Sequence, residues 1–518
     1  VNAAIKDVNI GVLVNEAGSL AVGQANDQSS ISVSGDNAAG IRLEGAALGS
    51  LVVNRSIEAA SGTAIDLSTD SQEEVKTIGS VALTGTIKGG EVGLDLSGSV
   101  LKSNLTVNRN TAISGGTGID LSGTRIGGSI SNNGTIESGA GTALLLSGAA
   151  AAAAGGTIAI ANAGTIGRAG GTAVDAVLGK EMTSGVSFTN TKTVNGNVRL
   201  ANAKGSKASH TITLKGGSTI TGNAATSAGN DSFVLSGVAA GDQAKVFKNA
   251  NAGDGWDVLK LEAGSVWTVD SEAEQGRLAG FEQIELTGKS TFTVVDDDYL
   301  PELGTFDGTN AQYSIDDGSA LSLVAGVDNG ASEGFVFTEA AEGAGIINVD
   351  GKGGVFAFGE TSADTPEART GEALYTGGHF TGTLNLENLS ATYEWNMAEA
   401  FRQADVHLGE KATLTVGEYD LGEDAARWSQ MHGLFLENGS TLVYTGSAGI
   451  SISSRNTENG LVNVFTDSRY KVNLVDHDGE SRTGTELALN GGTVSIQIDT
   501  ESEFHDGQET WHRVVEKP

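Results

Sequence analysis

Four aspartates recur at one position of a repeated pattern, and they are the residues with which this sequence could do chemistry. They are Asp66, Asp95, Asp120 and Asp175, each between two apolar residues. Paired carboxylates act as acid, base or nucleophile in the cleavage of polysaccharides. On parallel strands ~4.8 Å apart they would repel one another unless they were solvated or bound a cation. We expect no Lys or Arg at this position, so we favour solvent-facing polar residues over a catalytic site.

Carboxylates that could bind calcium lie in two other segments. Residues 253–259 partly match the Gly-x-Gly-x-Asp-x-Leu nonapeptide of calcium β-rolls, with Asp254 and Asp257 as the ligands. Asp316 and Asp317 offer oxygens without the spacing of an EF-hand loop. A β-roll would repeat its motif every nine residues, and this segment does not. We therefore expect no cofactor and no other metal, and keep these four aspartates as the calcium candidates.

The sequence lacks the residues that other kinds of catalytic or binding site require. Gly229-Asn230-Asp231-Ser232 and Leu48-Gly49-Ser50 are the nearest strings to a serine nucleophile, and both miss the required neighbours. The chain has no cysteine, so it has neither disulfides nor thiolate metal sites. Its net charge of −33 over 518 residues disfavours nucleic acid as a partner. We therefore favour a non-catalytic role.

A short apolar signature recurs along the first part of the chain and indicates the elements that carry these residues. A Gly- or Ala-rich turn precedes an apolar residue, then a polar residue and a second apolar one. The first apolar residues are separated by 24 to 30 residues and are Ile41, Ile65, Leu94, Ile119, Leu144 and Val174. A second apolar position precedes each of them by six to eight residues, at Val33, Ile57, Ile87, Ile113, Ile136 and Ile166.

This period predicts a right-handed parallel β-helix. Each unit offers short strands with alternate apolar residues, and such strands must stack on neighbouring units to bury their inner faces. A propeller blade needs about 40 residues, and helical repeats need an apolar period of 3.6. At ~25 residues a coil, the whole chain would hold roughly twenty coils. Asn132, Asn162 and Asn190 recur at one turn position, and we expect left-handed residues whose amides form a ladder from coil to coil.

Composition divides the chain into three ranges. Residues 1–200 carry 12 basic and 16 acidic residues and hold the regular coils, whereas residues 201–518 carry 19 and 48. In 201–300 the alternation continues in looser form. We expect 301–518 to be an acidic, β-rich range with further coils and protruding loops or a cap. Few aromatic residues are present, so we expect a core of Val, Ile, Leu and Ala.

The coils resemble those of a known family. Asn133-Gly134-Thr135-Ile136 and residues 116–123 look like coils of autotransporter (type V secretion) passenger domains. Residues 230–237, 256–261, 264–269 and 280–286 resemble the strand, Gly-rich turn and Phe-Glu-x-Ile series of such passengers. The resemblance covers about residues 30–295. It implies export through the outer membrane of a Gram-negative bacterium, with this chain as the passenger and its C-terminal membrane barrel absent.

The resemblance leads us to expect an adhesin or a self-association (biofilm) factor. It would be displayed on the cell surface or secreted, and would bind a surface protein or glycan through Ser, Thr and Asn side chains along one face of the solenoid. Loops around Trp395, Arg402, Trp428 and His432 are the candidate specific contacts. The alternative is a carbohydrate-active β-helix, either a polysaccharide lyase or hydrolase or a fibre like a phage tail spike.

Overall fold

The computed structural model describes residues in nineteen segments. They are 5–6, 8–23, 30–69, 74–153, 155–180, 182–270, 276–296, 303, 311–328, 330–337, 339–358, 380–393, 401, 404–416, 433–436, 440–444, 453–454, 475–476 and 493–496. The chain forms two compact units: unit 1 comprises residues 1–260 and 273–282, and unit 2 comprises 261–272 and 283–518. The three ranges predicted from composition stay a prediction.

The fold is an all-β solenoid of about 13 turns built from parallel strands. This confirms the predicted fold class, while the right-handed coil stays a prediction. The number of turns is below the expected twenty because that figure divided the full length by one coil, and the described coils cover part of the chain. The helical elements include the 3-10 turn η1 (Ala240–Asp242) and the single turn α1 (Gln243–Val246).

The strands of unit 1 stack in three rows, because corresponding strands of successive coils pair with one another. Row one comprises β3 (Ser30–Val33), β6 (Ser56–Ala59), β9 (Thr86–Gly89), β13 (Ala112–Ser114), β17 (Thr135–Ile136), the starts of β21 (Thr165–Leu178) and β23 (Thr193–Asn202), and β25 (Thr219–Ile220). Row two comprises β1 (Ile10–Val14), β4 (Ala39–Leu43), β7 (Thr63–Asp66), β10 (Val92–Asp95), β14 (Thr117–Asp120), β18 (Thr142–Leu145), the ends of β21 and β23, β26 (Ala224–Ala225), β28 (Asn249–Asn251) and β31 (Arg277–Ala279).

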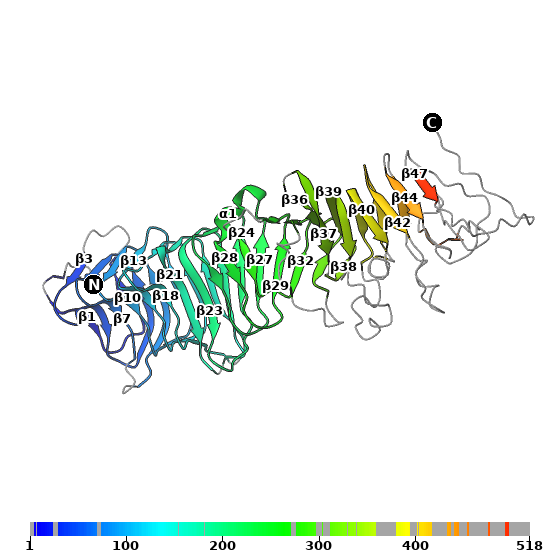
Figure 1. Ribbon diagram of the computed structural model, residues 1–518. Helices are drawn as coiled ribbons and strands as arrows, with labels where there is room; N and C mark the ends of the chain where they lie inside the picture. The colour runs from blue at the N-terminus through cyan, green and yellow to red at the C-terminus, as the bar shows by residue number, and fades with distance from the viewer. Residues whose placement is uncertain are drawn as a thin grey trace, which may run out of the picture. The chain divides into compact units, whose positions relative to one another are not determined.

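Row three lies in a second sheet. It comprises β2 (Leu20–Val22), β5 (Ala47–Val53), β8 (Thr77–Leu83), β11 (Val100–Leu101) with β12 (Leu105–Val107), β15 (Arg125–Ile126) with β16 (Ser129–Asn132), β19 (Ala150–Ala151) with β20 (Ile158–Asn162), β22 (Val186–Asn190), β24 (Thr211–Lys215), β27 (Ser232–Ser236) and β29 (Val258–Glu262). Figure 1 shows strands of successive coils side by side, from blue β7 through β10 and β18 to β23.

Apolar columns fill the interior of unit 1. In row one Ile57, Ile87, Ile113, Ile136 and Ile166 are register partners, and each is at most 1% exposed. The anchors of the 24 to 30 residue repeat form a second buried column in row two, from Ile41 to Val174. Strand alternation sends these side chains inward and their neighbours toward solvent. The spacing of the repeat is thus the length of one coil.

Glycines close the corner between row two and row three. Gly98, Gly123 and Gly148 have φ of 69°, 67° and 71°, which is the left-handed region. Glycine has no Cβ and adopts this conformation without strain. The recurring Leu-Ser-Gly string therefore turns the chain from one face of the solenoid to the next.

Unit 2 continues the parallel pattern with other strands. Its main row comprises β30 (Val266–Val269), β33 (Thr291–Val295), β35 (Ala320–Val324), β39 (Ile346–Phe358), β40 (Thr383–Tyr393), β42 (Thr413–Val416), β44 (Thr441–Tyr444) and β47 (Thr493–Ile496). The remaining strands are β32 (Gln283–Leu286), β34 (Tyr313–Ile315), β38 (Ala341–Gly343), β41 (Asp405–Leu408), β43 (Gly433–Leu436), β45 (Ser453–Ser454), β46 (Val475–Asp476), and the antiparallel hairpin of β36 (Gly326–Asp328) and β37 (Ala331–Phe337).

Aromatic side chains contribute to the core of unit 2. Phe292 and Tyr313 have ring centroids 6.4 Å apart, Tyr313 and Phe337 5.6 Å apart, and all three are buried. The expected core of Val, Ile, Leu and Ala describes the repeat columns of unit 1 and is incomplete for unit 2, where aromatic rings are buried beside these residues. The low overall aromatic content did not indicate this contribution.

Candidate functional site

Row three presents a continuous uncharged surface, which we call the hydroxyl face. It consists of outward side chains on β5, β8, β12, β16, β20, β22, β24 and β27. The first column is Ser50, Ser80, Asn104 (one residue before β12), Ser129, Ala159, Ser187, Thr211 and Ser232. The second column is Val52, Ala82, Thr106, Ser131, Ala161, Thr189, Thr213 and Val234.

Strand geometry sets the dimensions of the hydroxyl face. Neighbouring residues in a column are ~4.8 Å apart, and two outward residues on one strand are about 6.7 Å apart. Eight strands in register therefore extend the columns over roughly 34 Å. Every member is exposed or half-buried, and none is charged. In a protein of net charge −33, the two columns of this face present hydroxyl, amide and methyl groups and carry no charged side chain of their own.

The repeated aspartates form a separate column on row two. Asp66, Asp95 and Asp120 are register partners, Leu145 follows, and Asp175 is the next member. They therefore stack as the repeat predicts. The Oδ1 atoms of the first three accept hydrogen bonds from the backbone N–H groups two residues later, at Ser68, Ser97 and Ser122, at 3.2, 2.8 and 2.8 Å.

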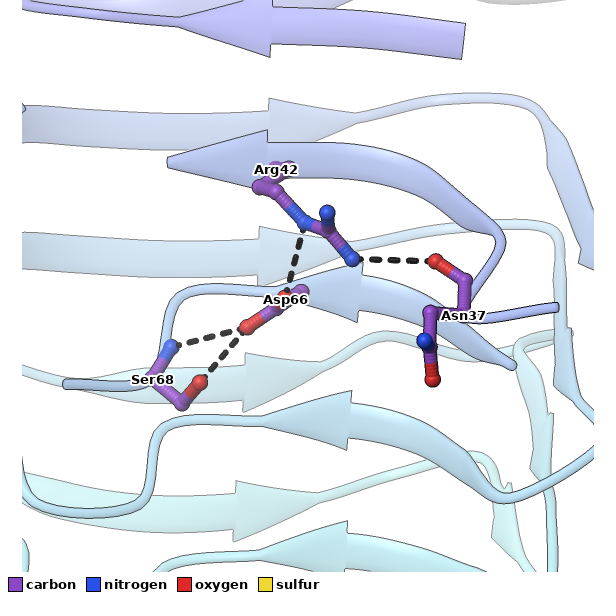
Figure 2. Close-up of polar contacts among 4 residues, drawn as sticks. All are labelled: Asn37, Arg42, Asp66 and Ser68. Atoms are coloured by element: carbon purple, nitrogen blue, oxygen red, sulfur yellow. Dashed lines mark hydrogen bonds and ion pairs between the residues drawn. The ribbon is translucent and has the colours of Figure 1, made fainter. Parts of the chain in front are cut away.

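Arginines flank this aspartate column, which corrects one sequence-based expectation. Arg42 is the register partner of Asp66 and its Nε donates to Asp66 Oδ2 at 3.1 Å, as Figure 2 shows. Arg199 is the register partner of Asp175, and its Nη1 lies 3.4 Å from Asp175 Oδ1. The expectation of no basic residue here was wrong, because the coil before Asp66 and the coil after Asp175 carry Arg at this position. Arg42 also donates to the Asn37 carbonyl oxygen at 3.0 Å.

The contacts of the aspartate column favour a structural role. Asp66 accepts from Ser68 on one oxygen and from Arg42 on the other (Figure 2). Burial raises the pKa of Asp95, its hydrogen bonds with Ser97 lower the pKa, and the carboxylates of Asp120 and Asp66 raise it further. These carboxylates hold the turn that leaves row two.

Three buried asparagines join successive coils at the ends of β16, β20 and β22, and we call them the amide ladder. Asn132 Nδ2 donates to Asn162 Oδ1, and Asn162 Nδ2 donates to Asn190 Oδ1, both at 2.8 Å. Each side chain is at most 1% exposed. Asn132 and Asn162 also accept from the backbone N–H two residues later. None has the left-handed conformation that we expected, because the asparagines complete strands instead of occupying the turn.

A second buried series lies directly before β24, β27, β29 and β32, and we call it the acid ladder: His210, Asp231, Asp257 and Glu282. The His210 backbone N–H donates to Asp231 Oδ1 at 2.5 Å. The Asp231 N–H donates to Asp257 Oδ1, and the Asp257 N–H donates to Glu282 Oε2, both at 2.6 Å. His210 Nδ1 accepts from the Val186 N–H at 3.1 Å. Each side chain therefore satisfies a donor one coil earlier.

The acid ladder has strongly shifted proton affinities. Burial raises the pKa of Asp257 to about 7 and that of Asp231 to about 6, and it also raises the pKa of Glu282. Burial lowers the pKa of His210 to about 4. His210, Asp231 and Asp257 are at most 1% exposed, and Phe233 and Phe281 pack edge to face nearby in sequence. Asp257 is therefore about half protonated near neutral pH, and Asp231 binds its proton about one pH unit lower.

Of the four aspartates considered as calcium ligands, two accept hydrogen bonds within the fold and two are exposed. Asp257 belongs to the acid ladder, whereas Asp254 is exposed. Asp316 accepts from the Gly288 N–H at 2.9 Å and from the Ser319 hydroxyl, so it holds a turn. Asp317 is exposed beside it. In the part of the chain that the structure describes, no three His, Asp or Glu residues form a group that could hold a metal ion.

The four predicted specific contacts lie outside the described residues: Trp395, Arg402, Trp428 and His432. The acid ladder and the hydroxyl face were missed as groups. A usable signal was present, since His210, Asp231, Asp257 and Glu282 each directly precede an alternating strand. Similarly, Thr211-Ile212-Thr213 shows hydroxyls on both outward positions of one strand.

Within the described ranges no helix has the length and apolarity to span a bilayer. Comparisons with protein-family models, curated proteins and solved structures find no match for this chain.

Proposed function

We propose that the chain is a non-catalytic adhesin that binds uncharged glycans of a cell surface through the hydroxyl face. The observation that carries this proposal is the absence of charge from two columns that continue over eight parallel strands. Hydroxyl groups donate and accept hydrogen bonds, as sugar hydroxyls do, and the methyl groups of Thr, Ala and Val suit the apolar faces of sugar rings. Contacts that repeat with the coil would reinforce one another along a polymer.

Display at the surface of a Gram-negative cell, or release from it as an autotransporter passenger, is part of this proposal. The solenoid fold and the coil repeats support it. The acidic remainder of the protein would oppose binding to sulfated or other anionic glycans. Protease treatment of intact native cells should remove the protein from the surface, and its protection until the cells are broken would contradict the proposed location.

The binding test uses the full chain with soluble neutral glucans and with sulfated glycans. Replacing Thr189 and Thr213 by Lys in one variant places two charges in the second column of the hydroxyl face, and we expect neutral-glycan binding to fall at least about tenfold. Thr86→Lys is the matched control, because Thr86 is an exposed strand residue of row one. Equal loss in both variants, or stronger binding to sulfated glycans, would contradict the proposal.

Two further outcomes would replace this proposal. Sedimentation that depends on protein concentration, abolished by the Thr189/Thr213 variant without any glycan binding, would make the face a self-association surface. Release of reducing sugar that Asp95→Asn abolishes would instead make the aspartate column catalytic.

A further inference from the structure

The carboxyl groups of the acid ladder connect successive coils. When a carboxyl group is ionised, it can accept hydrogen bonds but cannot donate one. Asp257 Oδ1 accepts from the Asp231 N–H, while Asp257 Oδ2 is buried without a partner. His210 Nε2 is likewise buried without a partner. An ionised oxygen in such a position loses its hydration and gains nothing in return. Burying the same carboxyl group costs less free energy when it carries a proton.

The groups that act on the ladder carboxyls are themselves acidic. Burial raises the pKa of Asp257 most, the hydrogen bond from the Asp231 N–H lowers it, and the charges of Asp231, Glu282 and Asp254 raise it further. Asp231 also lies near the Thr226 hydroxyl and the Ser227 N–H, which lower its pKa less than burial raises it. Within the described residues, the groups that shift the pKa values of these three carboxyls include no cationic side chain. Full ionisation would therefore place like charges on adjacent coils.

We propose that the acid ladder is a pH-dependent stabilising element that holds the coils of residues 186–282 together more tightly as the pH falls from 8 to 5. The geometry that supports it is one unbroken series of side chain to backbone bonds from Val186 to Glu282. This inference holds whether or not the hydroxyl face binds a glycan.

The direction follows from proton binding in the two states. The ordinary Asp pKa is 3.8, and the folded-state pKa values of Asp231 and Asp257 are about 6 and about 7. Between pH 4 and pH 7 the folded state therefore binds more protons than the unfolded state, so stability falls as the pH rises through this window. His210 acts in the opposite direction between its folded pKa of about 4 and its ordinary 6.5, but it is one group against three carboxyls.

Native-state hydrogen exchange of the full chain measures this effect at the donors themselves. The backbone amides of His210, Asp231 and Asp257 report on the acid ladder, and the Gly164 amide reports on the amide ladder. After correction for intrinsic exchange, protection of the first three should fall by up to about tenfold per pH unit for each proton released. Protection at Gly164 should change little.

Asp257→Asn tests the cause, because the amide oxygen can still accept from Asp231 but cannot titrate. We expect the pH dependence of protection at Asp231 to be lost in large part. Asp36→Asn is the control, since Asp36 is an exposed carboxylate and should leave the wild-type profile unchanged. A flat profile in the wild type, or an undiminished one in Asp257→Asn, would overturn the proposal.

A second measurement does not depend on the variant folding. In the wild-type chain labelled with 13C at the Asp side-chain carboxyls, titration should reveal midpoints well above the ordinary Asp range. If every Asp carboxyl titrates near pH 4, the proposal is wrong.

Discussion

The amide ladder and the acid ladder join coils of the same unit by different chemistry. Asn162 donates to Asn190 and accepts from Asn132, so the amide is used in both directions. Asp257 accepts from the Asp231 backbone and, when ionised, has no proton to donate. An amide series carries no charge at any pH, whereas an ionised carboxyl series places like charges on adjacent coils until protons are bound. The difference shows that one coil spacing accommodates both a permanent and a conditional connection.

The largest expected effect comes from breaking the amide ladder at its centre. Asn162→Leu keeps the approximate size of the side chain but leaves the Asn132 amide, the Gly164 N–H and the Thr193 carbonyl without their partner. Unsatisfied buried polar groups cost about 1–3 kcal/mol each, and neighbouring losses do not add fully, so we expect a loss of about 3–5 kcal/mol. Denaturant unfolding measures it.

Asn133→Leu is the matched control for that variant, because Asn133 is exposed on the same coil series. Its effect should stay within about 0.5 kcal/mol. Comparable losses of unfolding free energy in both variants would show that the amide ladder stabilises the fold no more than an exposed asparagine does.

An intermediate effect is expected when the amide ladder is given the chemistry of the acid ladder. In Asn162→Asp, one carboxylate oxygen would face Asn190 Oδ1 and the Thr193 carbonyl, which are both acceptors. The folded-state pKa of this new carboxyl should rise above its ordinary value. Stability relative to wild type should therefore be about 1–3 kcal/mol lower at pH 8 than at pH 4. Thermal unfolding across this range measures it, and a constant difference would refute the comparison.

The smallest effect should come from Asp254→Asn. Asp254 is exposed, and its charge is the last of the influences that raise the pKa of Asp257. Removing that charge should lower the titration midpoint of Asp257 by a few tenths of a pH unit, because water screens the interaction. Carboxyl NMR would detect it. A change as large as that from Glu282→Gln would mean that exposed charges dominate over burial.

The solenoid could be predicted because its rule is periodic. The positions of Ile57, Ile87 and Ile113 already require stacked strands, since a period of two within each unit and 24 to 30 between units has few other solutions. The stacking of Asp66, Asp95 and Asp120 followed from the same spacing. The Arg42–Asp66 pair did not, because Arg42 was not recognised as a member of that column.

The acid ladder could not be derived from spacing alone. Asp231 and Asp257 look like ordinary polar residues of loops, and their burial depends on how the chain enters the next strand. Asp257 was therefore interpreted as a calcium ligand. The hydroxyl face required the register of eight strands, because its columns collect residues from coils of unequal length.

The register between coils also decides how such a chain can change its length. Ile113, Ile136 and Ile166 occupy one column although the segments between them differ by seven residues. Adding a single residue within a strand would turn its apolar side chains outward. If an entire coil were lost or duplicated, the coils on either side would still pair in register. Whole windings are therefore the natural unit by which this molecule grows or shortens, and surplus residues accumulate at the corners.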